Sequence, residues 1–137
     1  MNEMQKKVIE FHRACGVPVS GTPTTLNAHR QELRIRLIKE ELQEYIDSAR
    51  ASNIIGIADA LGDLLVVIFG TAVEHGLNMQ PIFDEIHQSN MSKRNKDGSV
   101  SYDAGGKVMK GEGYKPPDLW ESIFGDIMMN RIASGKP

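Results

Sequence analysis

Five carboxylates fall on two neighbouring predicted helices, at spacings that allow them to converge. Glu40, Glu41 and Glu44 occupy one arc of about 100° when each residue advances the helix by about 100°. Asp59 and Asp63 are four residues apart and therefore share one face of the following helix. If the two helices form an antiparallel hairpin, the five side chains meet between them.

The chemistry that suits such a cluster is the binding of a hard divalent cation. Residues 40–47 contain no lysine or arginine, so the glutamates have no basic partners among them. Carboxylate oxygens favour Mg²⁺, with Mn²⁺ as the alternative, and no Cys/His set argues for zinc. The competing interpretation is that Asp59 and Asp63 pair with arginines such as Arg34 or Arg36.

Two other carboxylate or phosphate chemistries are disfavoured by spacing. No glutamate is followed three residues later by histidine, as a ferritin-like di-iron site requires. No His-Asp dipeptide occurs, which argues against HD-type phosphohydrolases.

The net charge of −2 conceals an acidic centre of −5 at residues 40–63 and a basic segment of +3 at residues 93–115. Acidic centres can hold cations and basic arms can hold phosphates.

Composition predicts one soluble domain over residues 1–137. The chain is 40% hydrophobic and 25% charged, close to globular averages. The lone Cys15 excludes an internal disulfide, and the polar start of the chain lacks the apolar region of a signal peptide. We therefore expect a cytoplasmic protein, without a nucleic-acid-binding signature.

The elements that position the acids are all helices. A helix is predicted at residues 3–14, and Thr24 or Thr25 is predicted to cap a long second helix that ends near Ala51. Asn53 is expected to cap a third helix from 54 to about 75, closed by a glycine at position 76. A fourth helix is expected after Asn78, through about residue 92.

The remainder of the chain is predicted to be less regular. Residues 95–115 contain Asp-Gly and Gly-Gly pairs, which favour a loop or small hairpin. A last helix is expected to start at residues 116–118, with Trp120, Phe124 and Ile127 on one face, before a frayed tail at 134–137.

The third helix is unusually apolar, because 14 of residues 54–73 are hydrophobic. Its length would suffice to span a bilayer, but Asp59 and Asp63 would each cost about 2.5–3.5 kcal/mol near the membrane centre. A buried helix is therefore the better interpretation. Because so few other helices are available to cover it, we expect a homodimer or homotetramer.

These features together resemble the all-α nucleoside triphosphate pyrophosphohydrolases, including MazG-like proteins. The family pattern is Glu-Glu-x-x-Glu, a variable gap, then Glu-x-x-Asp. Residues 40–44 match the first half in full, and Asp63 matches the final aspartate. Ala60 stands where the pattern has glutamate, with Asp59 one position earlier. The resemblance runs from Phe11 to Pro117.

The resemblance implies an all-α bundle of about five helices with a short arm near residues 95–115. It also implies an Mg²⁺-dependent site, with a motif glutamate (Glu40, Glu41 or Glu44) as the catalytic base. The implied metal ligands are Glu40, Glu41, Glu44, Asp59 and Asp63. The implied substrate contacts are Asn90, Lys93, Lys107, Lys110 and Tyr114.

The implied reaction is hydrolysis of a (deoxy)nucleoside triphosphate to the monophosphate and pyrophosphate. Two alternatives remain open. The first is phosphoribosyl-ATP pyrophosphohydrolase, which shares the fold and the acids. The second is a catalytically silent helical dimer that binds a nucleotide or a protein partner, an interpretation suggested by Ala60.

Overall fold

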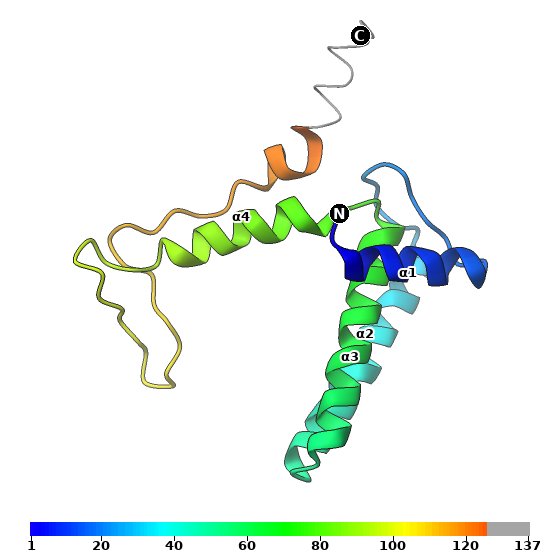
Figure 1. Cartoon of the computed structure of the whole chain (residues 1–137), viewed down its shortest axis with the longest axis horizontal. Helices are drawn as coiled ribbons and strands as arrows, with labels where there is room; N and C mark the ends of the chain where they lie inside the picture. The colour runs from blue at the N-terminus through cyan, green and yellow to red at the C-terminus, as the bar shows by residue number, and fades with distance from the viewer. Residues whose placement is uncertain (126–137) are drawn as a thin grey trace, which may run out of the picture. The chain divides into compact units, whose positions relative to one another are not determined.

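A computed structural model describes residues 1–125. The order of helices is α1 (Glu3–Ala14), α2 (Ala28–Arg50), α3 (Ile54–Glu74) and α4 (Met79–Met91) (Figure 1). Residues 119–125 are also helical, and residues 1–125 contain no strand longer than a single bridge, so the all-α prediction is confirmed. The chain divides into two compact units, Met1–Met79 and Gln80–Pro137. The single domain over 1–137 stays a prediction.

The first unit is built around α2 and α3, which pack along each other, while α1 also contacts α3 (Figure 1). Asn53 caps α3 as predicted, because its side-chain oxygen accepts a hydrogen bond from the Gly56 N–H at 3.2 Å. A Cβ at Gly56 would lie 2.5 Å from Ser48 Oγ of α2. Glycine at this position therefore permits the close approach of the two helices.

The start of α2 differs from the prediction of a Thr24 or Thr25 cap. The helix begins at Ala28, and Asn27 caps it by accepting a backbone hydrogen bond at 2.9 Å. The Thr24 backbone is instead bound to the end of α3: its N–H donates to the His75 carbonyl at 2.9 Å. His75 Nδ1 in turn lies 2.8 Å from the Thr24 carbonyl oxygen. This pairing holds the threonine outside the helix.

The end of α3 carries a buried ion-pair cluster. Glu74 is 2% exposed and accepts two hydrogen bonds from Arg30, at 2.7 and 2.6 Å. Arg34 lies 3.4 Å from the same carboxylate and donates to Thr71 Oγ1 at 3.0 Å. Burial lowers the pKa of Arg34, and the charge of Glu74 opposes that shift. The cluster ties α2 to the last turn of α3.

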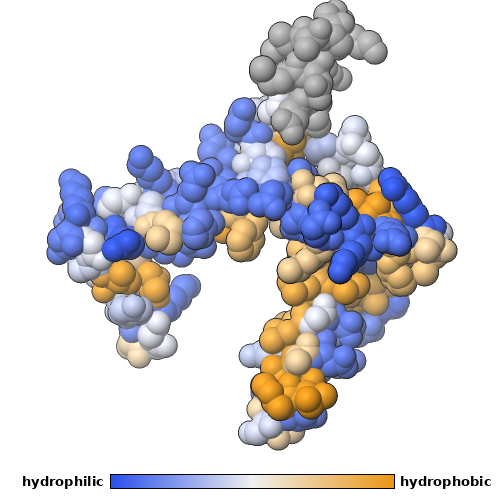
Figure 2. Space-filling view, viewed as in Figure 1, coloured by the Kyte–Doolittle hydropathy of each residue, from blue (hydrophilic) through white to orange (hydrophobic). Residues whose placement is uncertain are grey.

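Most of α3 is not covered by the rest of this chain, although the sequence predicts a buried helix. Ala60, Ala72 and Val73 are buried against other parts of the first unit. Apolar side chains gather as a patch on the pair of helices α2 and α3 (Figure 2). The exposed ones on α3 are Ile54, Ile55, Leu61, Leu65, Val66 and Ile68. Within residues 1–125, α3 is also the one helix long and apolar enough to cross a membrane by length and composition.

The second unit consists of α4, a hairpin-like loop and the helical residues 119–125. The loop makes one antiparallel bridge between Tyr102 and Val108, in agreement with the predicted loop or small hairpin. Its return segment is bound to α4, because Ser89 donates to the Lys115 carbonyl at 2.8 Å. In the last predicted helix, the rings of Trp120 and Phe124 lie 4.5 Å apart. Ile127 and residues 134–137 lie outside the described residues.

Candidate functional site

The predicted acidic cluster lies on the α2–α3 pair. Glu40, Glu41 and Glu44 are in the second half of α2, and Asp59 and Asp63 are in the first half of α3. Since the chain reverses over residues 51–53, these two halves run alongside each other. The helix register and the turn therefore place the acids near the same end of the α2–α3 pair.

The electrostatics of Glu41 show that the other four acids act on this residue. The pKa of Glu41 is raised, first by partial burial and then by like charges on the neighbouring carboxylates. In decreasing order of effect, those carboxylates are Glu44, Asp63, Glu40 and Asp59. Glu41 thus lies in the combined field of acids from both helices.

Within the described residues, few basic side chains lie close enough to these five acids to neutralise their charge. Arg36 Nε lies 3.6 Å from Glu40 Oε1, and both side chains are more than half exposed. Arg34, the other arginine considered for the aspartates, is bound to Glu74 instead. Among residues 1–125 no ion pair reaches Asp59 or Asp63. The interpretation that these aspartates are structural ion-pair partners of Arg34 or Arg36 is therefore wrong.

Ala60, which stands where the family pattern has glutamate, is buried in the interior of the first unit. Ala60 is 2% exposed, whereas Asp59 and Asp63 are exposed, four residues apart on the same helix. A glutamate at position 60 of this structure would have to enter a packed interior. Asp59 is thus the carboxylate in this turn that is free to act alongside Asp63.

The donor set suits a hard divalent cation, although the side chains are not drawn together around a point. All five donors are carboxylates, which are the ligands that Mg²⁺ and Mn²⁺ prefer. Within the described part of the chain, no three Asp, Glu, His or Cys side chains are close enough to hold a metal ion as they stand. Binding would therefore require rotamer changes in exposed side chains, which occur readily.

A separate cavity of about 430 Å³ lies in the second unit. All five predicted substrate contacts line it: Asn90, Lys93, Lys107, Lys110 and Tyr114. The Lys110 ammonium lies 4.4 Å from the centre of the Tyr114 ring, within the range of a cation–π contact. Because α4 supplies one wall and the loop that follows it supplies another, residues up to 31 positions apart, Ile86 and Pro117, are brought together here.

The cavity also contains a carboxylate that the sequence analysis did not single out, Asp103. Its Oδ1 accepts hydrogen bonds from the Gly105 and Lys107 backbones, both at 2.9 Å. An aspartate two residues before a Gly-Gly pair is a turn signal that could have identified its local role. Its position in the cavity depends on how the hairpin folds against α4, which periodicity does not reveal.

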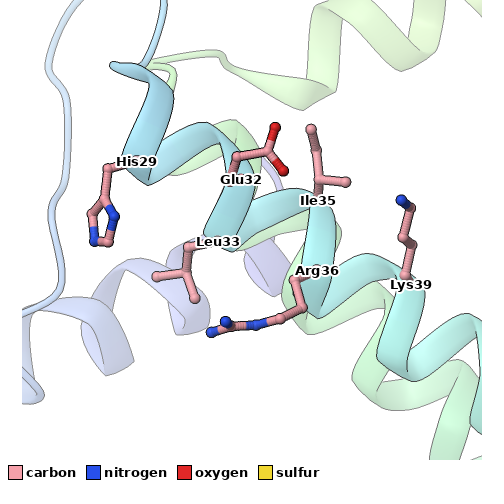
Figure 3. A pocket seen from close by; sticks show the side chains of 6 residues that line it. All are labelled: His29, Glu32, Leu33, Ile35, Arg36 and Lys39. Carbon is pink, nitrogen blue, oxygen red and sulfur yellow. The ribbon is translucent and has the colours of Figure 1, made fainter.

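A second hollow, of about 610 Å³, lies along α2 (Figure 3). All of its lining residues come from this one helix: His29, Glu32, Leu33, Ile35, Arg36 and Lys39. Figure 3 shows these side chains projecting from both sides of the helix. Such a hollow is open helix surface, and none of the predicted site residues contributes to it.

Comparisons with known proteins bear on both parts of the chain. The family described as phosphoribosyl-ATP pyrophosphohydrolase matches residues 8–90, which include all five acids and end at Asn90. The chain is also similar to uncharacterized protein L479 of Acanthamoeba polyphaga mimivirus, with 35% identity over 78 residues. That match covers 51% of this chain and 30% of the viral protein, so the chain spans less than a third of that relative's length.

One solved structure is similar along nearly the full length. It is that of a protein from Exiguobacterium sp. 255-15 with a provisional assignment as an NTP pyrophosphohydrolase. The two chains share 23% identity with a TM-score of 0.49, over 97% of this chain and 98% of the other.

Proposed function

The chain belongs to the phosphoribosyl-ATP pyrophosphohydrolase family, within the all-α NTP pyrophosphohydrolases, and from this premise we propose its reaction. Membership makes pyrophosphate-releasing hydrolysis the general class. The specific proposal is Mg²⁺-dependent hydrolysis of a (deoxy)nucleoside triphosphate to the monophosphate and pyrophosphate. The observation that carries it is the placement of five carboxylates near one end of the α2–α3 pair, where the like charges of the other four act on Glu41.

Glu40, Glu41, Glu44, Asp59 and Asp63 would hold the metal. Bound Mg²⁺ supplies charge neutralisation on the phosphates and acidifies water. The chain itself would supply the base, one of the motif glutamates Glu40, Glu41 or Glu44. Water adds to a phosphorus of the α–β bridge, the bridging P–O bond breaks, and the proton passes to the glutamate.

We also propose that the second-unit cavity binds a nucleotide. The ammonium groups of Lys93, Lys107 and Lys110 suit phosphate oxygens, and charge-assisted hydrogen bonds of this kind are strong. Asn90 and the Tyr114 ring suit the base or sugar. A triphosphate carries several negative charges, so cationic groups are needed in addition to an acidic metal site.

The test is pyrophosphate release across a nucleotide panel that includes phosphoribosyl-ATP, with and without Mg²⁺. We expect turnover of one or more nucleoside triphosphates in Mg²⁺ and none in EDTA. Exclusive turnover of phosphoribosyl-ATP would establish the alternative that the family description favours. Binding without turnover of any compound would establish the catalytically silent alternative.

The role of the cavity is tested by Lys93→Ala against Lys96→Ala. Both changes remove one positive charge from the same segment, but only Lys93 lines the cavity. Loss of one charge-assisted hydrogen bond, worth about 1.5–3 kcal/mol, should raise KM by about tenfold or more in Lys93→Ala. Equal KM values for the two variants would remove the cavity from substrate binding.

A further inference from the structure

We propose that Asp103 is a specificity-determining residue that accepts a hydrogen bond from the exocyclic amino group of a nucleotide base. The inference rests on the proposed function, in which the second-unit cavity binds nucleotide. It adds that the preferred substrates carry an amino group where related nucleotides carry a carbonyl.

The turn at residues 103–107 of the second unit fixes the Asp103 carboxylate at the cavity. The Asp103 N–H donates to the Lys107 carbonyl at 2.9 Å, and Oδ1 accepts from the Gly105 and Lys107 N–H groups at 2.9 Å each. Gly106, with φ of +83°, completes the turn in a conformation that favours glycine. In the part of the chain that the structure describes, both hydrogen bonds of the Asp103 side chain use Oδ1, so Oδ2 is left to accept a hydrogen bond from a ligand.

The charge of Asp103 is opposite to that of the other ionised groups lining the cavity. Three lysines line it with this single carboxylate, and no ion pair joins Asp103 to a lysine within the described residues. A carboxylate repels phosphate oxygens. The phosphates should therefore bind at the lysines, and the group that meets Asp103 should belong to the neutral part of the nucleotide.

The walls around the carboxylate suit a base. Val108, Met109 and Pro117 give the cavity apolar surface, and Tyr114 adds an aromatic ring. An ionised carboxylate has acceptors only, so it can bind the amino group of cytosine or adenine. A carbonyl at the same place would set two acceptors against each other. A site built in this way excludes the keto analogue as well as binding the amino form.

Asp103→Asn separates this role from the turn. Asparagine keeps an oxygen for the Gly105 and Lys107 N–H groups, but it loses the charge and presents an amide donor in place of Oδ2. Asp118→Asn is the matched control: it also removes one negative charge from the second unit. Asp118 Oδ1 likewise accepts a backbone hydrogen bond, from Trp120 at 3.1 Å, and Asp118 does not line the cavity.

The experiment measures the full chain with two matched pairs, CTP against UTP and ATP against ITP. The members of each pair differ in the amino or keto substituent and in whether the adjacent ring nitrogen carries a hydrogen, while sugar and phosphate contacts cancel. We expect the wild-type chain to prefer the amino member of at least one pair by about tenfold in kcat/KM, the effect of one hydrogen bond. The preference should fall to near unity or reverse in Asp103→Asn, and persist in Asp118→Asn. Binding of the non-hydrolysable analogues should show the same ratios.

Three results would overturn the inference: no amino preference in the wild-type chain, an unchanged preference in Asp103→Asn, or equal weakening of both members of a pair. The first needs no variant, so a folding defect cannot conceal it. Failure of the proposed function looks different. In that case no nucleotide releases pyrophosphate, while a shift in the analogue-binding ratio on Asp103→Asn would still support the base contact.

Discussion

At the scale of single residues, the proposed chemistry centres on Glu41. This side chain combines partial burial with the negative charge of four other acids, and both raise its pKa. A carboxylate in such a field is unfavourable in the empty protein and favourable beside a cation. The arrangement that is unfavourable without a metal should therefore favour the binding of a divalent ion.

Glu41→Gln should reduce Mg²⁺-dependent turnover by about two orders of magnitude or more, because it removes the charge of a proposed metal ligand while nearly keeping the shape of the side chain. The metal-free variant should unfold at the same or a higher temperature than the wild-type chain, since like-charge repulsion is relieved. Added Mg²⁺ should stabilise the wild-type chain more than the variant. Pyrophosphate release and thermal unfolding measure these effects.

The matched control is Glu32→Gln, which changes an exposed glutamate of the same helix outside the cluster. It should leave turnover unchanged. Near-normal turnover in Glu41→Gln would show that the cluster is not the active site.

The acids could be predicted from sequence because helical periodicity alone fixes which side chains share a face. The effect of the neighbouring negative charges on Glu41 could also be expected, because it requires only that the two adjacent helices pack against each other. Asp103 and Glu74 were not predicted, for a different reason. Their roles depend on which backbone and side chains arrive from elsewhere, and a lone acid in a sequence carries no such information.

At the scale of elements, the junction of α2 with the end of α3 depends on Glu74. The carboxylate is fully buried and joined to Arg30 and Arg34. Burial already lowers the pKa of Arg34, so this guanidinium depends on its acidic partner. A Cβ at Gly70 would lie 2.6 Å from Arg34 Nη2, which shows how closely the arginine is packed.

Glu74→Gln should lower the free energy of unfolding by about 3–5 kcal/mol, because it leaves a buried guanidinium without a counter-charge. Urea unfolding measures the change. Glu3→Gln is the control, since Glu3 pairs with Lys6 at 2.6 Å on the exposed surface of α1. This control should hardly move the unfolding midpoint. If the two variants unfold alike, the buried cluster does not stabilise the junction.

Helix existence was predictable, but one helix start was not. Asn53 and Gly76 combine a cap residue or glycine with a clear change in hydrophobic pattern, so the bounds of α3 follow from sequence. Near α2, the chain offers Thr24, Thr25 and Asn27, all acceptable caps. The hydrogen bonds between Thr24 and His75 keep Thr24 outside the helix, and the local sequence pattern cannot predict such a long-range contact.

At the scale of the whole molecule, the apolar surface of α3 requires a cover. Leu61 and Leu65 are 45% and 47% exposed, and they are four residues apart on one helix face. A Cβ added at Gly62 would meet nothing within 4 Å, so this part of the helix is open to close approach. Asp59 and Asp63 interrupt the apolar run, which favours a protein cover over lipid. We propose that a second copy of the chain supplies the cover.

Light scattering at micromolar concentration should therefore give a dimer or tetramer of the 15.2 kDa chain. Leu65→Gln should shift the population toward the monomer, because it places a polar amide in the covered face. Phe83→Ser, at a 64% exposed position of α4, should not. A monomeric wild-type chain that still hydrolyses nucleotide would contradict the proposal.

The sequence predicted that α3 needs partners but not how little of it this chain covers. Composition shows that a helix is apolar on most sides, and only the packing shows which sides remain exposed. Ala60 and Val73 face other elements of the first unit, whereas Ile54 and Ile55 are 70% and 76% exposed.

The most direct measurement of the central claim is Mn²⁺ binding to the full chain, followed by electron paramagnetic resonance. The wild-type chain should bind Mn²⁺, and Mg²⁺ should displace it. Asp63→Asn should weaken binding by about tenfold or more, because affinity in oxygen-ligand sites follows the number of charged ligands. Glu10→Gln, an exposed acid on α1, should bind as the wild-type chain does. Equal Mn²⁺ affinity in the wild-type chain and Asp63→Asn would contradict the assignment of the α2–α3 carboxylates as the metal site.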